Sequence, residues 1–270
     1  MAHPQIAAFA GSADGGVKPL RSIAGQNTLF TRTIHDMAYD GVRDEILVPS
    51  FYAFGILTFK GDATGDVAPI RKIFGPHTGL KLPERLAVDA VHGEIFVPQG
   101  DSVLVFPRDA DGDVAPIRIL KGPDTQLGAA SLTVDPVHNL LIAVNGGSKS
   151  RILVFNRTDS GNTKPLRAIT DLSGAFLGGV EQMTTYPPRG YILVTVRLGR
   201  GGAQQTSEDQ YVGVWSIYDN GNVPPLWTIG GPHGMLRDIR GVAVDPKRKN
   251  VFISDKYVNG ILTYHFPEIF

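Results

Sequence analysis

One phrase recurs five times along this 270-residue chain, and it limits the fold more than any other feature. Each copy has a polar turn containing Gly, followed by a short apolar segment that begins at a proline. The copies are GSADGGVKPLRSIAG (11–25), GDATGDVAPIRKIFG (61–75), RDADGDVAPIRILKG (108–122), RTDSGNTKPLRAIT (157–170) and YDNGNVPPLWTIGG (218–231). A repeat of about 50 residues is typical of proteins built from stacked copies of one supersecondary unit.

The third copy contains DADGD (109–113), which is similar to the start of an EF-hand calcium loop. An EF-hand needs a bidentate Glu late in the loop, but the chain has Leu120 there. The feature shared by all copies is a Gly turn before a short strand. In such turns Gly supplies a positive φ, and Asp or Asn tolerates one. We therefore interpret the phrase as a structural turn.

Three more strand-like segments lie between successive copies. The first alternates and mostly ends in Asp, the second is more apolar, and the third carries an aromatic residue near its end. The first type comprises MAYD (37–40), LAVD (86–89), LTVD (132–135), the degenerate MTTY (183–186) and VAVD (242–245). Four hairpin-connected strands form one antiparallel sheet, which cannot bury both faces alone. We predict an all-β fold, a β-propeller of four-stranded antiparallel blades in a single domain, 1–270.

Five blades are expected, because the first, second and fourth strand types each occur five times. The third type occurs six times if IAAFA (6–10) is counted, so six blades are possible if this segment starts an incomplete blade. The chain ends on a third strand, ILTYHF (261–266), and the phrase at 19–24 can supply the missing fourth. We therefore predict a ring closed between the N- and C-terminal strands.

Composition argues against several classes of partner and cofactor. The 26 basic residues balance 26 acidic ones, so we expect no nucleic-acid partner. We find no apolar run long enough for a membrane span, no Walker loop and no Cys, so we expect no nucleotide cofactor and no thiol chemistry. We expect a monomer. A secreted or periplasmic location is favoured if a signal peptide has been removed.

The polar side chains expected at the propeller axis are the candidate functional residues. The first strand of a blade lies nearest the axis and the second runs back, so the start of one and the end of the other share a face. The candidates on this face are His35, Asp36, Glu84, Arg85, Ser131, Asn145, Glu181, Gln182, Arg197, Arg240 and Asp255. The inserted loop 197–210 (RLGRGGAQQTSEDQ) follows the second strand of the fourth repeat and can act as a lid on the same face.

Two stretches, PERLAVDAVHGEIFVPQGDSVLVF (83–106) and RGVAVDPKRKNVFISDKYVNGILTYHF (240–266), resemble NHL repeats in their order of strands and Asp turn. The resemblance covers essentially the whole chain and is weakest in the fourth repeat. NHL-like propellers include ligand-binding modules, amidating lyases and neighbours of the gluconolactonase type. An amidating lyase needs several histidines at the axis to bind zinc. His35 is the only one of the seven histidines that we expect there, so this chain departs from the amidating-lyase pattern.

The gluconolactonase resemblance suggests a set of ligands for Ca²⁺ or another divalent cation. These metal ligands would be Glu84, Asn145, Glu181 and Asp255. In this interpretation the chain is a metal-assisted hydrolase or lyase acting on a lactone, ester or similar small oxygenated substrate, with His35, Asp36 and Arg240 as catalytic residues. Asp36 can orient the His35 imidazole as a general base, although a packed histidine is the alternative.

The other interpretation is a ligand-binding or scaffold propeller that presents a polar axial funnel. There Arg85, Arg197 and Arg240 pair with the acids, and a small molecule or peptide is held by Arg85, Arg197, Gln182 and Ser131. Both interpretations expect the carboxylates of Glu84 and Glu181 to approach each other, because they occupy equivalent positions in their blades. Two neighbouring carboxylates need a cation or an arginine between them.

Overall fold

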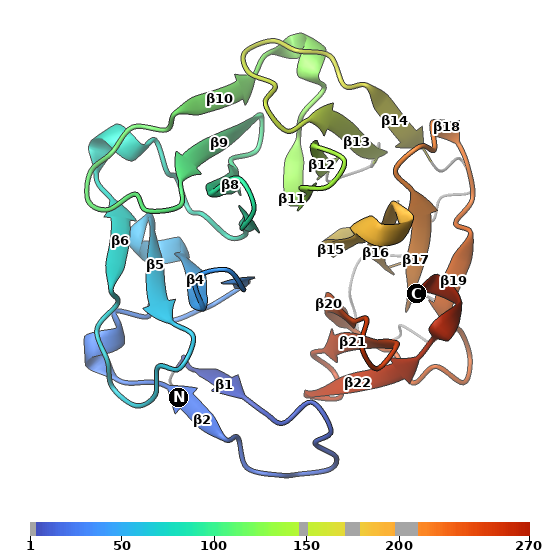
Figure 1. Cartoon of the computed structure of the whole chain (residues 1–270), viewed down its shortest axis with the longest axis horizontal. Helices are drawn as coiled ribbons and strands as arrows, with labels where there is room; N and C mark the ends of the chain where they lie inside the picture. The colour runs from blue at the N-terminus through green and yellow to red at the C-terminus, as the bar shows by residue number, and fades with distance from the viewer. Residues whose placement is uncertain (1–3, 146–150, 171–178, 198–209) are drawn as a thin grey trace. The chain divides into compact units, whose positions relative to one another are not determined.

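The computed structural model describes residues 4–145, 151–170, 179–197 and 210–270. In these ranges the regular elements are β-strands and single-turn 3-10 helices (Figure 1). The predicted fold class is confirmed: the chain is an all-β β-propeller with five antiparallel blades. The inserted loop 197–210 lies outside the described residues except at its two ends.

The chain divides into two compact units. The first unit comprises Met1–Gln99 and Leu104–Ile119, and the second comprises Gly100–Val103 and Leu120–Phe270. The predicted single domain and the predicted closure of the ring concern how these units combine, so both stay predictions.

The first blade and the N-terminal hairpin belong to the first unit, and the division runs through the outer strands of the second blade. The N-terminal hairpin pairs β1 (Ile6–Ala8) with β2 (Arg21–Ile23). The first blade contains β3 (Ala38–Asp40), β4 (Glu45–Ser50), β5 (Gly55–Lys60) and β6 (Arg71–Phe74). The second contains β7 (Ala87–Asp89), β8 (Glu94–Pro98), β9 (Ser102–Pro107) and β10 (Arg118–Lys121).

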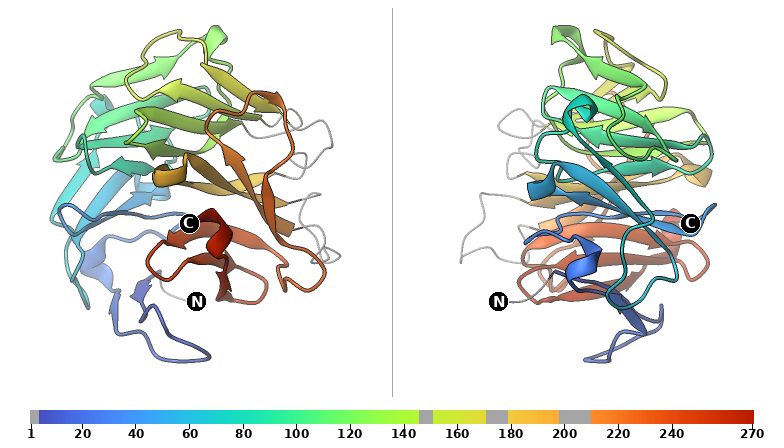
Figure 2. Two further views of the ribbon diagram at one scale, coloured as in Figure 1. Left: turned by 45° about the vertical axis from the view of Figure 1, so that its right-hand side comes forward. Right: turned by 90° about the vertical axis from the view of Figure 1, so that its left-hand side faces the viewer.

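Three further sheets belong to the second unit. The third blade contains β11 (Ala129–Asp135), β12 (Leu140–Asn145), β13 (Arg151–Asn156) and β14 (Arg167–Thr170), and β18 (Gly221–Asn222) pairs with β14 in parallel. The fourth contains β15 (Val180–Tyr186), β16 (Tyr191–Arg197), β17 (Gln210–Ser216) and β19 (Trp227–Gly230). The fifth contains β20 (Ile239–Asp245), β21 (Asn250–Asp255) and β22 (Gly260–His265). The third and fourth blades lie side by side, with β11 against β15 (Figure 2).

The second strands β4, β8, β12 and β16 are buried on both faces, whereas β21 of the fifth blade alternates between buried and partly buried residues. In the first unit Leu47 of β4 shares a core with Ile95 and Phe106 of the second blade. In the second unit Ile142 of β12 shares a core with Val194 of β16. Burial on both faces explains why these strands are almost continuous apolar runs rather than alternating ones.

The aspartates that end the first strands hold the turn to the second strand. One carboxylate oxygen of Asp89 accepts hydrogen bonds from the backbone N–H groups of Val91 and His92, at 3.0 and 2.9 Å. Asp40, Asp135 and Asp245 do the same in their own blades. This repeated contact explains the Asp at the end of the first strand type, because Asx turns satisfy the backbone locally.

The repeated Gly turn has a second role that the sequence did not indicate. In four of the five copies its glycine pairs with the strand that precedes the blade: Gly65 with Ile23, Gly112 with Ile73, Gly161 with Leu120 and Gly221 with Ile169. Gly112 donates to the carbonyl of Lys72 at 2.8 Å and accepts from Phe74 at 3.1 Å. Asp111 accepts from the Lys72 N–H at 2.9 Å, and Asp113 accepts from the His77 N–H at 2.8 Å. The DADGD stretch is therefore an inter-blade clip in which Asp111 and Asp113 hold backbone N–H groups of the neighbouring blade.

Candidate functional site

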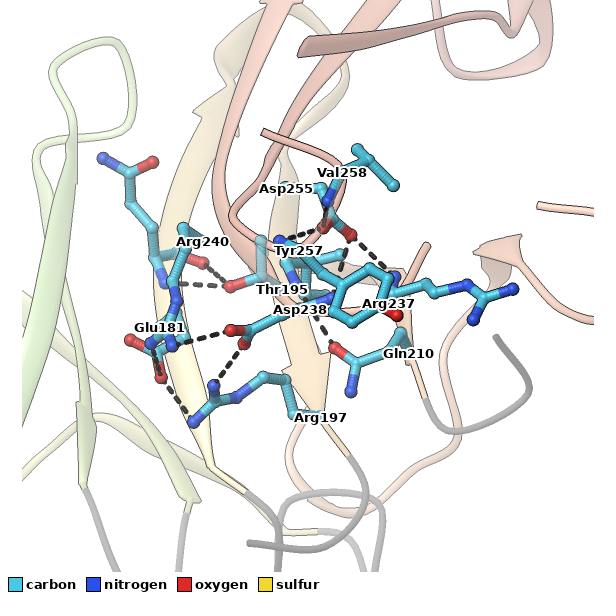
Figure 3. Close-up of polar contacts among 12 residues, drawn as sticks. Glu181, Thr195, Arg197, Gln210, Arg237, Asp238, Arg240, Asp255, Tyr257 and Val258 are labelled. Atoms are coloured by element: carbon cyan, nitrogen blue, oxygen red, sulfur yellow. Dashed lines mark hydrogen bonds and ion pairs between the residues drawn. The ribbon is translucent and has the colours of Figure 1, made fainter. Parts of the chain in front are cut away.

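Four charged side chains of the second unit form a closed network of ion pairs (Figure 3). Arg197 lies 2.6 Å from a Glu181 oxygen and 2.8 Å from an Asp238 oxygen. Arg240 contacts the same two acids, at 2.9 and 3.1 Å. Each carboxylate therefore lies between two guanidinium groups, and the four charges sum to zero. We call Glu181, Arg197, Asp238 and Arg240 the charge network.

Bulges in two first strands help to place these side chains. The register between β15 and β16 shifts between Val180 and Met183, so that Glu181 and Gln182 lie in a bulge. Thr195 fills this bulge, because its hydroxyl accepts from the Gln182 N–H at 2.8 Å and donates to the Gln182 carbonyl at 2.9 Å. Bulges of this kind re-aim side chains.

The equivalent register shift in β20 lies between Ile239 and Gly241, and it contains Arg240. The two bulged segments are tied together, because the Gln182 side-chain oxygen accepts from the Val242 N–H at 3.0 Å. A Cβ atom on Gly241 would lie 2.7 Å from that oxygen and 2.8 Å from the Ser254 hydroxyl. Gly241 is thus needed for the close approach of β20 to its neighbours.

The network is partly shielded from water. The exposed fractions of the side chains are 12% for Arg197, 15% for Glu181, 24% for Asp238 and 38% for Arg240. Ion pairs at such depth are screened less by salt than pairs on an open surface. Removing one arginine would leave two carboxylates close together with a single counter-charge, which is unfavourable. The network is therefore a preorganised arrangement with Arg240 as its most accessible member.

Asp255 lies near the network but holds backbone. Its side chain is buried, and one oxygen accepts from the N–H groups of Arg237 and Asp238, at 2.6 and 2.9 Å. The other oxygen accepts from Tyr257 and Val258, at 2.8 and 3.2 Å. These four contacts fix the loop that carries Asp238 into the network.

Residues that end other second strands act in the same way. The Asn145 side chain accepts from the Gly128 N–H at 2.8 Å and donates to the Gln126 carbonyl at 2.6 Å. The Gln99 side chain accepts from the Lys81 N–H at 2.6 Å. Gln99, Asn145 and Asp255 thus each hold, within their own blade, the loop that precedes the first strand.

The remaining candidates are distributed over both units. Ser131 is buried in β11 of the second unit. In the first unit Asp36 is buried and accepts from the Leu86 N–H at 3.2 Å, while His35 is exposed with its ring 5.5 Å from the Phe51 ring. The predicted pairing of His35 with Asp36 for catalysis stays a prediction.

Glu84 is exposed and Arg85 is half-buried, both in the first unit. The predicted approach of Glu84 to Glu181 joins the two units and stays a prediction. Within the second unit the structure brings Glu181, Arg197 and Arg240 together, as the ion-pair interpretation expected. It adds Asp238, which sequence reasoning missed. The sequence did contain a signal, because Asp238 stands two residues before Arg240. It was missed because the first strand of the fifth blade was predicted at 242–245, whereas β20 begins at Ile239.

The contacts of Glu181 and Asp255 do not fit a metal site in this arrangement. A hard cation needs carboxylate oxygens directed at one point, but a Glu181 oxygen accepts from two arginines and Asp255 accepts from four N–H groups. Among the described residues no three His, Asp or Glu side chains form a group suited to an ion. The divalent cation expected from the sequence therefore stays a prediction.

Comparisons with known proteins show the fold alone. The chain is similar to a structure titled "Kuenenia stuttgartiensis Hydrazine Synthase", with 12% identity and a TM-score of 0.59 over 91% of this chain and 58% of that one. It is also similar to a chain in "Crystal Structure of Mitotic Checkpoint Complex", with 13% identity and a TM-score of 0.59 over 92% of this chain and 67% of that one. The chain thus spans little more than half of the first structure and two thirds of the second.

No protein-family model matches the sequence, and no curated protein matches it. No helix in the described ranges is long and apolar enough to cross a membrane.

Proposed function

We propose that this β-propeller is a binding scaffold without catalytic activity of its own, and that it holds a small carboxylate-bearing ligand at the charge network. The observation that carries the proposal is the closed set of ion pairs among Glu181, Arg197, Asp238 and Arg240. A site whose alternating charges are already fixed suits the binding of a ligand, because little free energy is lost in ordering the side chains when the ligand binds.

Arg240 is the group that would contact the ligand. A guanidinium has five N–H donors, and the ion pairs of Arg240 engage its two terminal nitrogens with one acid each. Each terminal nitrogen carries a second hydrogen, so a ligand carboxylate can accept from Arg240 without breaking either ion pair. Asp238, the second most accessible member, would repel a second anion nearby and favour a ligand with a positive or neutral group beside its carboxylate.

The preference for binding over catalysis rests on the state of the acids. In the metal-assisted hydrolase interpretation, a carboxylate of the site must move a proton or hold a cation. Here the arginines hold the Glu181 and Asp238 oxygens at ion-pair distances. The resemblance to NHL repeats is compatible with this role, because ligand-binding modules occur among such propellers.

The test is calorimetric titration of glycine and acetate into the wild-type protein and into Arg240→Gln. Arg248→Gln is the matched control, because it removes the same charge beyond the opposite end of β20, where Arg248 pairs with Asp245. We expect saturable binding to wild type and to Arg248→Gln, and a loss of at least tenfold in affinity in Arg240→Gln. Equal binding by all three proteins, or no binding by any, would overturn the proposed ligand class.

A parallel assay decides between scaffold and enzyme. Hydrolysis of δ-gluconolactone and of p-nitrophenyl acetate is measured with added Ca²⁺ or Mg²⁺. The scaffold proposal expects rates equal to the protein-free control. Cation-dependent hydrolysis that disappears in Glu181→Gln would establish the hydrolase instead.

A further inference from the structure

The turn between the second and third strands of the first blade contains a residue that is out of place there. Phe54 has a left-handed backbone with φ of 54°. In the equivalent turns of the second and fifth blades, the left-handed positions hold Gly100 and Asn259, which tolerate this conformation. A bulky aromatic residue is strained at such a position by about 1 kcal/mol or more.

Packing does not compensate for this strain. The Phe54 side chain is 49% exposed, and the neighbouring Tyr52 is 46% exposed. Neither residue belongs to the buried core of the first unit. Leu29, Leu82 and Met235 are also exposed at left-handed positions, so such strain does not by itself mark a site. Phe54 differs from these three residues in presenting an aromatic ring to solvent.

The rings of Phe51 and Tyr52, which precede Phe54 in the same turn, are held in place by contacts within the first unit. Tyr52 packs edge-on against Phe51 with ring centres 4.9 Å apart, and Phe51 in turn lies against His35. Arg32 donates to the Tyr52 hydroxyl at 2.9 Å, and its guanidinium lies 5.3 Å from the centre of the Tyr52 ring. These aromatic surfaces are therefore preorganised, which lowers the entropic cost of binding.

Arg32 differs from three other arginines of this unit, Arg71, Arg108 and Arg118, in its electrostatic environment. Arg71, Arg108 and Arg118 each form an ion pair with a buried acid of the same unit. In the described part of the chain Arg32 contacts a neutral hydroxyl and an aromatic ring, and no carboxylate lies within ion-pair distance of it. An acidic group on a partner would complement this charge.

We propose that Arg32, His35, Phe51, Tyr52 and Phe54 form a docking surface for a polypeptide segment that presents an apolar side chain next to a carboxylate. Aromatic residues and arginine are enriched in the energetic centres of protein interfaces. Phe54 and Tyr52 would contact the apolar side chain, and Arg32 would pair with the carboxylate. This surface lies in the first unit and is independent of the charge network in the second.

The probe is an array of synthetic peptides in which Leu, Phe or Trp is flanked by Asp or Glu, with a matched array in which Lys replaces the acids. We expect the wild-type protein to bind the acidic array and not the basic one. Affinity for the best peptide should fall at least tenfold in Phe54→Asn and in Arg32→Gln. Phe74→Asn is the control, because Phe74 is equally exposed in β6 of the same unit and should leave binding unchanged.

A second readout distinguishes a binding residue from a structural one. Phe54→Asn places at this turn the residue that the fifth blade uses at position 259, so it should leave the melting temperature unchanged or raise it while peptide binding is lost. A lower melting temperature would show that Phe54 stabilises the fold, and the proposal would then be wrong. Equal binding of acidic and basic peptides would also overturn it.

Discussion

The inter-blade clip makes a quantitative prediction at Gly122, which precedes a single-turn helix after the fourth strand of the second blade. Gly122 has φ of 144° and ψ of 167°, a region that essentially only glycine adopts. A Cβ atom there would lie 2.4 Å from the side-chain oxygen of Asn162, the clip residue of the following blade. Gly122→Ala must therefore strain the backbone and displace Asn162.

The magnitude follows from these two effects. The backbone strain costs about 1–3 kcal/mol. Displacing Asn162 breaks its bond from the Asp124 N–H, at 2.7 Å, and its bond to the Asp124 carboxylate, at 3.0 Å. These exposed bonds are worth about 0.5–1 kcal/mol each. The expected loss of unfolding free energy is therefore about 2–5 kcal/mol.

The assay is urea unfolding followed by circular dichroism, with Gly161→Ala as the control. Gly161 belongs to the same clip and also has a positive φ, 63°, but an added Cβ would meet nothing within 4 Å. Its substitution should cost about 1–2 kcal/mol, the cost of a left-handed residue. If both variants unfold at the same urea concentration, the close approach of Gly122 to Asn162 does not determine stability.

Two further predictions concern a clip acid and a close contact. Desolvation raises the pKa of Asp113, but hydrogen bonds from the ring and backbone N–H of His77 outweigh it and hold the pKa below the usual value. Asp113 therefore stabilises the fold above about pH 4, where the unfolded acid is ionised, and this contribution is lost as the pH falls through the lowered pKa. The variant Asp113→Asn has at this position the residue type that the next copy of the turn has at Asn162, and its melting temperature should fall less between pH 5 and pH 3 than that of the wild type. A pH profile identical to that of the wild type would refute the pairing. Gly241→Ala should cost about 1–2 kcal/mol, because the added methyl group displaces the Gln182 oxygen from the Val242 N–H, and thermal unfolding at wild-type stability would contradict this contact.

The strand pattern and the repeat were sufficient to predict the blades. The four strand types recur in register, and each Asp that ends a first strand has the turn role that its position indicates. The clip was not predictable, because Gly112 and Asp113 bond to residues about 40 positions earlier in the chain. A turn motif gives no information about such a long-range partner.

The charge network was predicted in part for a similar reason. Equivalent positions in successive blades indicated that Glu181, Arg197 and Arg240 share a face. Asp238 joins them through a loop that Asp255 fixes with its hydrogen bonds, and the length of that loop does not follow the repeat. Asp255 stands at a position where the sequence predicted a metal ligand. In the structure its two oxygens accept hydrogen bonds from four backbone N–H groups.

The measurement that tests the central claim most directly is calorimetric titration of Ca²⁺ into chelator-treated protein, compared between wild type and Glu181→Gln. If Arg197 and Arg240 neutralise the acids of the network, the two proteins should give the same heats, because no carboxylate of the network is directed at an ion. A saturable calcium-binding event in wild type that is absent from Glu181→Gln would contradict the account. It would show that a cation displaces the arginines, and it would assign the site to metal-assisted chemistry.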